Sequence, residues 1–449
     1  MAYLFFTIDM VFEAKWGTSV WGYECTAIVK HYSLLITHYS LLQHTYLYYL
    51  HSIYLFRTET TVRFSKELYD IVIIGAGPAG LNAGSYISRN FNGSVLLVDK
   101  TIPWEHPIAC AEGVGRLGFE YSVEVKKSWI RQEIWSACFH APGGGMITYR
   151  DKNGGFIINR ASMQSDLAEQ ICADGVECVF NCRVKGVSLF ETGVRRLTFE
   201  DGSSVSARVV IDASGPVCGI GKGEKIAWKP LDLEPAYFVW VEGIETSPDQ
   251  IHIYAGQKIA PGGYAWVFPR DNGANIGVVI GKRYVGQCNI RHLLDNFIDN
   301  NFKSAKIVQR FAGAIPCSTK HGPVASAGLI KTGDAASTIN PISRAGISEA
   351  LLSGRLAGVA ALEMLGAGCE KRIKSICKNY ESAWNQKRGN RHIKLSKVKN
   401  SLLSVPDEDY NKGAALLSST PLEELTMSRI FAVSLGRFPR LVWAMRHLM

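Results

Sequence analysis

The sequence predicts an α/β protein in which a nucleotide-binding, Rossmann-like domain is interrupted by a β-rich domain and followed by a helical C-terminal region. Three patterns indicate this fold. A Gly-x-Gly-x-x-Gly turn joins an apolar strand to a helix near residue 75, alternating strands with glycine breaks fill residues 235–283, and a helical pattern begins at Ser348. We assign residues 67–165 and 318–368, with part of 166–230, to the nucleotide-binding domain, 231–317 to a β-rich substrate domain, and 369–449 to the helical region.

The composition is that of a globular protein with a large core. Hydrophobic residues make up 47% of the 449 residues and charged residues 20%. The 11 cysteines include no Cys-x-x-Cys pair, which argues against a zinc framework or a secreted disulfide scaffold. We therefore expect a cytoplasmic protein with no metal site.

The net charge of +9 is concentrated towards the C-terminus. Residues 371–400 contain ten Lys and Arg residues and one acid, Glu381. Such a helix face is either simply solvated or attracts anionic lipid head groups at a membrane surface. The stretch lacks the interleaved aromatic residues of a nucleic-acid platform, so we expect no nucleic-acid partner. Residues 429–449, "RIFAVSLGRFPRLVWAMRHLM", mix bulky apolar residues with arginines and predict either an interfacial helix pair or a cover over the substrate cavity.

Residues 1–66 differ from the rest of the chain. The stretch "HYSLLITHYSLLQH" repeats a seven-residue unit between His31 and His44. Histidines at positions 38, 44 and 51 interrupt the apolar runs before they reach the length that spans a bilayer, and the layout of a signal peptide is absent. We expect an extension that is not part of the fold, with a membrane-surface segment as the alternative.

The glycine turn predicts a dinucleotide site. Gly75 allows the tight turn after the strand, Gly77 lets the backbone approach a pyrophosphate, and Gly80 lets helix and strand pack closely. The pyrophosphate would lie at the helix N-terminus, where free N–H groups favour anions. Asp99, at the end of the second strand, is placed to bind the adenosine ribose.

A second element favours FAD over NAD. Asp334 follows an apolar strand, and a Pro-Gly loop then leads into a helix that begins near Gly346 and Ile347. In many flavoproteins such an element completes the FAD site, with the acid at the ribitol or pyrophosphate and the helix N–H groups at the flavin ring. The alternative is that Asp334 only caps a helix.

These motifs together resemble the geranylgeranyl reductase family of FAD enzymes, and especially its archaeal-type digeranylgeranylglycerophospholipid reductases. The resemblance covers about residues 68–400 and rests on "GAGPAG" with Asp99, "CAEGVG" at 110–115, "NRASMQSDLAEQ" at 159–170, "YAWVFP" at 264–269 and the "GDAAS…P…GI" element that ends at Ile347. The aromatic motif is the most specific, since the glycine motifs are shared with the wider group of p-hydroxybenzoate-hydroxylase-like flavoproteins.

The resemblance implies cofactor contacts residue by residue. Gly80 and Asp99 would bind the ADP half of FAD, Val184 would contact adenine through its backbone, and Arg160 would lie close to the cofactor. The loop of Cys110, Ala111 and Gly113 would pass beside the flavin, and Asp334, Gly346 and Ile347 would complete the site. Four features depart from the family pattern: Asp99 replaces Glu, Ala111 replaces Gly, Gly277-Val278-Val279 replaces a Gly-x-Gly, and Arg344-Ala345 stands where glycine and small residues are common.

The stretch "YAWVFP" places three aromatic rings on one face of a strand. Tyr264, Trp266 and Phe268 alternate, so their side chains point the same way. They would form an apolar wall for a polyprenyl chain, with the tyrosine hydroxyl and indole N–H orienting a polar end. The alternative is an ordinary core strand.

The resemblance implies hydride transfer from a flavin to an isolated prenyl double bond, with a proton added at the other carbon. The catalytic candidates are Cys110 and Tyr264 as proton donors and Trp266 as part of the wall; a small apolar role for Cys110 is the alternative. The electron donor would be NAD(P)H or a ferredoxin-like protein, and the lipid substrate implies peripheral membrane contact. A flavin monooxygenase of an aromatic or quinone substrate and an electron-transfer flavoprotein stay open, because the same fold supports them.

Overall fold

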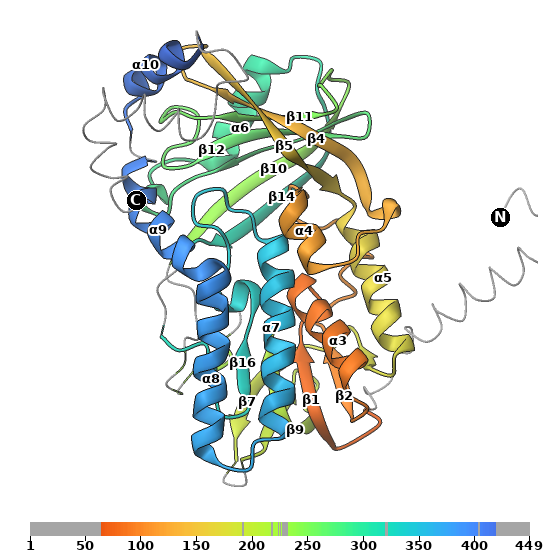
Figure 1. Ribbon diagram of the computed structural model, residues 1–449. Coiled ribbons are helices and arrows are strands. Elements are labelled where there is room, and N and C mark those ends of the chain that lie inside the picture. Colours follow the sequence, from red (N-terminus) through yellow and green to blue (C-terminus); the bar gives the residue numbers. More distant parts are fainter. Residues whose placement is uncertain are drawn as a thin grey trace, which may run out of the picture. The chain divides into compact units, whose positions relative to one another are not determined.

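The computed structural model describes residues 64–418, apart from 191–192, 217–218, 223, 225, 227–231, 319–321 and 403–404 (Figure 1). All of these belong to one unit of the chain, Thr61–Met449. Two sheets organise it, and Figure 1 shows one above the other. The expectations for residues 1–63 and 429–449 fall outside the described residues.

The first sheet is the predicted nucleotide-binding one. Its parallel strands lie in the order β16 (Leu329–Lys331), β9 (Ser204–Asp212), β1 (Leu68–Ile74), β2 (Val95–Val98) and β6 (Glu177–Val179). β15 (Ala325–Ser326) pairs antiparallel with β16 at the edge. β7 (Val184–Leu189) and β8 (Arg195–Phe199) run antiparallel into β9. The alternating residues and turn signals of residues 184–215 predict a three-stranded meander that ends in a buried strand, and β7, β8 and β9 form it.

Apolar residues cover both faces of this sheet. Ile71 and Ile73 of β1 point to helices α3 (Pro78–Asn90), α5 (Arg160–Ala173), α7 (Ile347–Leu365) and α8 (Glu370–Trp384). Val72 and Ile74 point to the opposite face, which the β7–β8 meander covers. Because both faces are buried, β1 is a nearly continuous apolar run.

Helices α3 and α7 pack unusually closely. A Cβ at Gly354 would collide with the carbonyl of Ala79, and one at Gly358 would lie 3.1 Å from the carbonyl oxygen of Ala83. Asn82 of α3 also donates to the carbonyl oxygen of Leu351 at 2.7 Å. These contacts fix the two helices side by side.

The second sheet has the order β14-β10-β13-β12-β11-β4-β5-β3. Its strands are β3 (Gly113–Gly115), β4 (Ile130–His140), β5 (Met146–Ile158), β10 (Leu233–Glu242), β11 (Gln250–Tyr254), β12 (Tyr264–Arg270), β13 (Gly273–Val279) and β14 (Lys306–Pro316). Helix α6 (Ile290–Asn301) packs on one face, against Val267, Ile276 and their neighbours. The other face carries the aromatic residues of β10, β12 and β14.

The second sheet includes strands from a segment that the sequence assigns to the nucleotide-binding domain. Strands β3, β4 and β5 belong to the second sheet, although residues 113–158 were expected in the nucleotide-binding domain, 67–165. β4 and β5 form a long hairpin whose connection contains Pro142 and three glycines. The hairpin joins β11, more than one hundred residues away, through a parallel pairing that no local pattern indicates.

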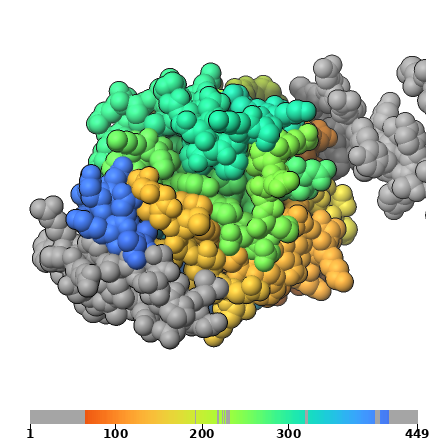
Figure 2. All heavy atoms as spheres, turned by 90° about the horizontal axis from the view of Figure 1, so that it is seen from above, coloured from red at the N-terminus to blue at the C-terminus, as the bar shows by residue number. Residues whose placement is uncertain are grey.

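The helical C-terminal region is confirmed as far as it is described. After α8 the chain passes through a π-helical turn, Asn385–Gly389, into α9 (Asn390–Leu402) and then α10 (Asp407–Ser418). Asn411 of α10 accepts a hydrogen bond from Gly143 N at 2.6 Å, and Figure 2 shows α10, in blue, against the β4–β5 turn, in orange. Among the described helices, none is both long and apolar enough to cross a bilayer.

The shorter elements connect these layers. They are α4 (Arg116–Ser122) and the 3₁₀ turns Lys127–Trp129, Lys282–Tyr284 and Gly333–Ala336. The chain makes contacts from Phe64 onward, three residues before the expected boundary at 67. The Phe64 ring stacks on Phe199 at 4.7 Å between centroids, and Ser65 N donates to Glu177 at 3.0 Å.

The contacts of Phe64 and Ser65 predict different stabilities for two truncated proteins. Deleting residues 1–60 should leave the melting temperature and cofactor content unchanged, because the contacts of Phe64 and Ser65 remain. Deleting residues 1–66 removes them and should lower stability by about 1–3 kcal/mol, mainly through the lost aromatic burial. Thermal unfolding of the two proteins beside the full chain measures both effects. A large loss in the shorter deletion would show that residues 1–60 stabilise the fold.

Candidate active site

The glycine turn after β1 leaves open space at the start of α3. Gly75 has a φ of +105°, and a Cβ there or at Gly80 would collide with backbone carbonyls. A Cβ at Gly77 would meet nothing within 4 Å. Gly77 is the N-cap of α3 and no side chain caps the helix, so the N–H groups of its first turn are left for another acceptor. This arrangement fits an anionic pyrophosphate.

Asp99 lies beside this turn, as expected. Its carboxylate accepts hydrogen bonds from Ala76 N at 2.7 Å and Thr101 N at 2.9 Å. The backbone of Asp99 also binds Val179 and Cys182, which brings the segment after β6 alongside. Val184 begins β7 two residues beyond Cys182. Its contact with adenine stays a prediction.

A second uncapped helix begins next to the first. Gly346 is the N-cap of α7 and no side chain caps it, while Ile347 is the first helical residue. Gly333 packs against Ala79 at the start of α3, since a Cβ on Gly333 would lie 2.8 Å from that of Ala79. The element after β16 therefore lies between the two helix starts, as the sequence predicts.

Asp334 occupies this junction without capping α7. A Cβ at Gly346 would lie 3.9 Å from its Oδ1, but α7 has no side-chain cap, so the alternative of a simple cap does not describe it. Burial raises the pKa of the Asp334 carboxyl to about 6, and the positive charge of Arg160 opposes this only in part. A carboxylate in such a setting is ready to accept hydrogen bonds from a ligand.

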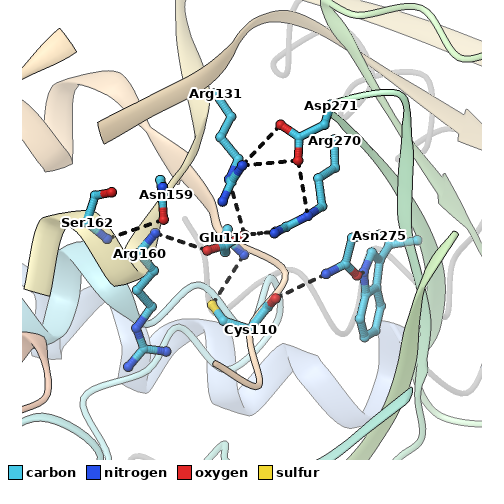
Figure 3. Close-up of polar contacts among 10 residues, drawn as sticks. Cys110, Glu112, Arg131, Asn159, Arg160, Ser162, Arg270, Asp271 and Asn275 are labelled. Atoms are coloured by element: carbon cyan, nitrogen blue, oxygen red, sulfur yellow. Dashed lines mark hydrogen bonds and ion pairs between the residues drawn. The ribbon is translucent and has the colours of Figure 1, made fainter. Parts of the chain in front are cut away.

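The loop before β3 joins the two sheets, and Figure 3 shows its polar contacts. Glu112 lies at its centre, is 4% exposed and has a φ of +62°. Its carboxylate accepts a hydrogen bond from Arg160 N at 3.0 Å and forms an ion pair with Arg270. Arg131 Nε lies 3.9 Å away and Arg131 also pairs with Asp271. An uncommon backbone conformation held by this many partners is typical of functional loops.

Asn275 links the same loop to the aromatic strand. Its side chain donates to the carbonyl oxygen of Cys110 at 3.1 Å and accepts from the indole N–H of Trp266 at 2.8 Å. Sequence patterns did not indicate Glu112, Arg270, Arg131 or Asn275. Only Glu112 had a usable signal, as a charged residue inside the "CAEGVG" motif.

The predicted loop residues lie against the aromatic face. The sulfur of Cys110 is half-buried and accepts a hydrogen bond from Glu112 N at 3.2 Å. Ala111 packs against the aromatic cluster. A Cβ at Gly113 would lie 2.9 Å from the ring of Phe268, so any larger residue would require the ring to shift.

The aromatic strand β12 is partly wall and partly core. Tyr264, Trp266 and Phe268 share one face, whereas Ala265 and Val267 point to α6. Trp266 is 5% exposed and packs on Phe238, and a Cβ at Gly277 opposite would collide with its indole. Tyr264 and Phe268 are half-buried. Trp266 therefore fits the interpretation as an ordinary core strand, whereas a wall for a prenyl chain stays a prediction for Tyr264 and Phe268.

The polar side-chain atoms of Tyr264 and Trp266 are both engaged in hydrogen bonds. The Tyr264 hydroxyl donates to the carbonyl oxygen of Ser343 at 2.6 Å, and burial raises its pKa to about 12. The indole N–H of Trp266 is bound to Asn275. Both side chains are therefore better suited to fixing the wall than to donating a proton.

Arg344 does not project towards the helix starts. It has a φ of +56°, lies with its guanidinium 4.9 Å from the Tyr264 ring and pairs with Glu234 of β10 at 2.7 Å. It also donates to the carbonyl oxygen of Gly262. Arg344, which replaces the small residue common at this position, therefore connects the loop before α7 to the second sheet.

Two solved structures share this fold. A geranylgeranyl bacteriochlorophyll reductase-like protein from Thermoplasma acidophilum has a TM-score of 0.76 and 24% identity, covering 85% of this chain and 100% of that one. A flavin-dependent brominase has a TM-score of 0.60 and 19% identity, covering 83% of this chain and 99% of that one. These likenesses define the fold.

Sequence relatives define the family. The model of the geranylgeranyl reductase catalytic domain matches residues 232–315, and that of the lycopene cyclase protein matches residues 70–227. A digeranylgeranylglycerophospholipid reductase from Methanosarcina acetivorans is 30% identical over 85% of this chain and 97% of its own length. The chain belongs to the geranylgeranyl reductase family, which confirms the resemblance seen in the sequence.

Substitutions at the second and third glycines of the turn, Gly77 and Gly80, should cause different defects. Gly77→Val should leave the apoprotein stable, because the new side chain enters open space, but should weaken flavin binding at least tenfold. Gly80→Ala should destabilise the apoprotein by about 1–3 kcal/mol, because its Cβ meets the Gly75 carbonyl. Flavin content and apoprotein melting temperature distinguish them. Normal flavin retention by Gly77→Val would refute this placement of the cofactor.

Asp334→Asn should have opposite effects on stability and binding. The folded pKa of about 6 lies above the ordinary value of 3.8, so the folded apoprotein binds more protons than the unfolded chain between these values. Its stability therefore falls as pH rises from about 4 to about 6, and the penalty persists above. The Asn variant should melt higher than wild type at pH 7.5 and equally at pH 4, yet bind flavin more weakly. If the variant and the wild type melt at the same temperature at each pH, the buried carboxylate does not destabilise the folded protein.

Proposed function

We propose that this protein is an FAD-dependent oxidoreductase that reduces isolated carbon–carbon double bonds of geranylgeranyl chains in a lipid. One observation carries the proposal. The aromatic face of β12 meets the Cys110–Gly115 loop, with the ring of Phe268 against Gly113, next to the two uncapped helix starts. An apolar wall thus borders the region that fits a dinucleotide.

The residues present suit FAD. The start of α3 would hold the pyrophosphate, Asp99 the ribose, and Asp334 the ribitol or pyrophosphate region. The N–H groups at Gly346 and Ile347 would face the ring, where negative charge is favoured by the start of α7. A bound FAD would supply the hydride.

The wall would position the prenyl chain and exclude water. Trp266, Phe238 and Phe311 form its buried base, with Phe238 and Phe311 stacked at 4.7 Å between centroids. An isolated double bond is not polarised by a carbonyl, so its reduction needs a fixed geometry and a proton donor in a dry site.

Cys110 is the proton donor that the hydrogen bonding favours. Its sulfur accepts from Glu112 N, which leaves its own S–H proton for donation. The Tyr264 hydroxyl, by contrast, is bound to Ser343. Cys110→Ser would keep a donor, whereas Cys110→Ala would remove it.

A cavity of about 500 Å³ lies near the Tyr264 end of the wall. Lys282, Arg283 and Lys399 line it together with Asp232 and Glu234, and Lys399 pairs with Asp232 at 2.7 Å. This polar setting suits the head group of a lipid whose chain lies along the wall.

The lipid substrate implies contact with a membrane surface. Lys371, Arg372 and Lys378 of α8 are exposed and can attract anionic head groups. Lys399, which the sequence placed in the same basic run, instead points inward to its acidic partners. The electron donor would be NAD(P)H or a ferredoxin-like protein.

Mass spectrometry of lipid products tests the function. Chemically reduced holoprotein incubated with a geranylgeranyl phospholipid should yield products that gain two hydrogens per reduced bond. Phe268→Ala should lower product formation at least about tenfold with flavin content retained, because the wall loses its ring over the cofactor loop. Phe190→Ala, which removes an exposed ring, 45% accessible, directly after β7, is the matched control.

Two other outcomes would overturn the proposal. Oxygen-dependent hydroxylation of an aromatic compound, with no saturated lipid, would indicate a monooxygenase. Reoxidation by a quinone without any saturation would indicate an electron-transfer flavoprotein.

A further inference from the structure

A second cluster of reactive side chains lies on the face of the second sheet that points away from the aromatic wall. Cys138 and His140 of β4 are two residues apart and therefore share a face. His252 of β11 is the register partner of Cys138. His252 is also the partner of Val267, which points to α6, so the cluster is separate from the proposed cofactor site.

The three side chains converge on one point. His140 Nε2 and His252 Nδ1 lie 3.0 Å apart. The Cys138 sulfur and one nitrogen of each imidazole all lie within 4.8 Å of one another. Cys138 is 3% exposed and forms no disulfide, whereas both histidines are half-buried.

The surroundings hold the rings in place. Tyr254 stacks on His140 at 4.0 Å between centroids and packs in turn on Phe297 of α6 at 4.8 Å. An imidazole binds a metal ion through the lone pair of its neutral form.

We propose that Cys138, His140 and His252 bind a borderline-soft divalent cation of the Zn²⁺ type, with a fourth position left to water. One thiolate and two imidazoles are the donor set that suits Zn²⁺, whereas Mg²⁺ and Ca²⁺ require oxygen ligands that this group lacks. Binding would release the thiol proton of Cys138 to solvent and form the sulfur–metal bond.

The location gives the ion a structural role. β4 and β11 are parallel, while the other strand pairs in the described part of this sheet are antiparallel. Parallel pairing is slightly weaker per residue, and here it joins two segments more than one hundred residues apart. The ion would tie the two segments together.

Cobalt titration of the full-length holoprotein tests the site. After treatment with a chelator, we expect one equivalent of Co²⁺ to bind with a thiolate charge-transfer band and the strong visible bands of a four-coordinate ion, both abolished by Zn²⁺. Cys138→Ser should lose the charge-transfer band, and His252→Gln should weaken binding at least tenfold. Zn²⁺ should raise the melting temperature of wild type and of neither variant.

Control variants show whether the cobalt signal depends on the three proposed ligands. Cys288→Ser, at a half-buried cysteine that packs on the α6 face of the second sheet, should bind Co²⁺ like wild type. Flavin content reports folding, and His140→Gln replaces any variant that fails to retain flavin. Absence of the charge-transfer band in wild type, or its persistence in Cys138→Ser, would overturn the proposal.

Discussion

The contact of the Glu112 carboxylate with Arg270 and Arg160 N is the interaction on which the site depends. It joins the loop before β3 to the start of α5 and to the end of β12. Removing the carboxylate would leave Arg270 and Arg131 facing each other in a partly buried place, which is strongly unfavourable. The strained backbone of Glu112, with its φ of +62°, shows that the surrounding contacts outweigh a local penalty.

A second clamp holds the other end of the same strand. At the start of β12, Tyr264 donates to Ser343, and Arg344 spans from the loop before α7 to Glu234. The aromatic wall is thus tied at both ends to loops that border the two uncapped helix starts. This double attachment fixes the distance between the wall and the proposed cofactor region, and transfer of a hydride to an unactivated bond demands such a fixed distance.

Local sequence patterns predicted individual structural elements but not the long-range contacts that connect them. The glycine turn, the β7–β9 meander and the aromatic face of β12 depend on neighbours in sequence, and the structure contains all three. The Glu112–Arg270 pair spans 158 positions and the His140–His252 pair 112, so neither could be read from spacing. The membership of β4 and β5 in the second sheet escaped prediction for the same reason, because it follows from a parallel pairing with β11.

Anaerobic reoxidation of the reduced holoprotein tests the central claim most directly. Mixing with a geranylgeranyl lipid should restore the absorbance of the oxidised flavin in proportion to the double bonds reduced, whereas the fully saturated lipid should leave the flavin reduced. Such a difference would place an isolated double bond in contact with the cofactor along the β12 wall. Equal rates with both lipids, or no reoxidation by the unsaturated one, would contradict the account.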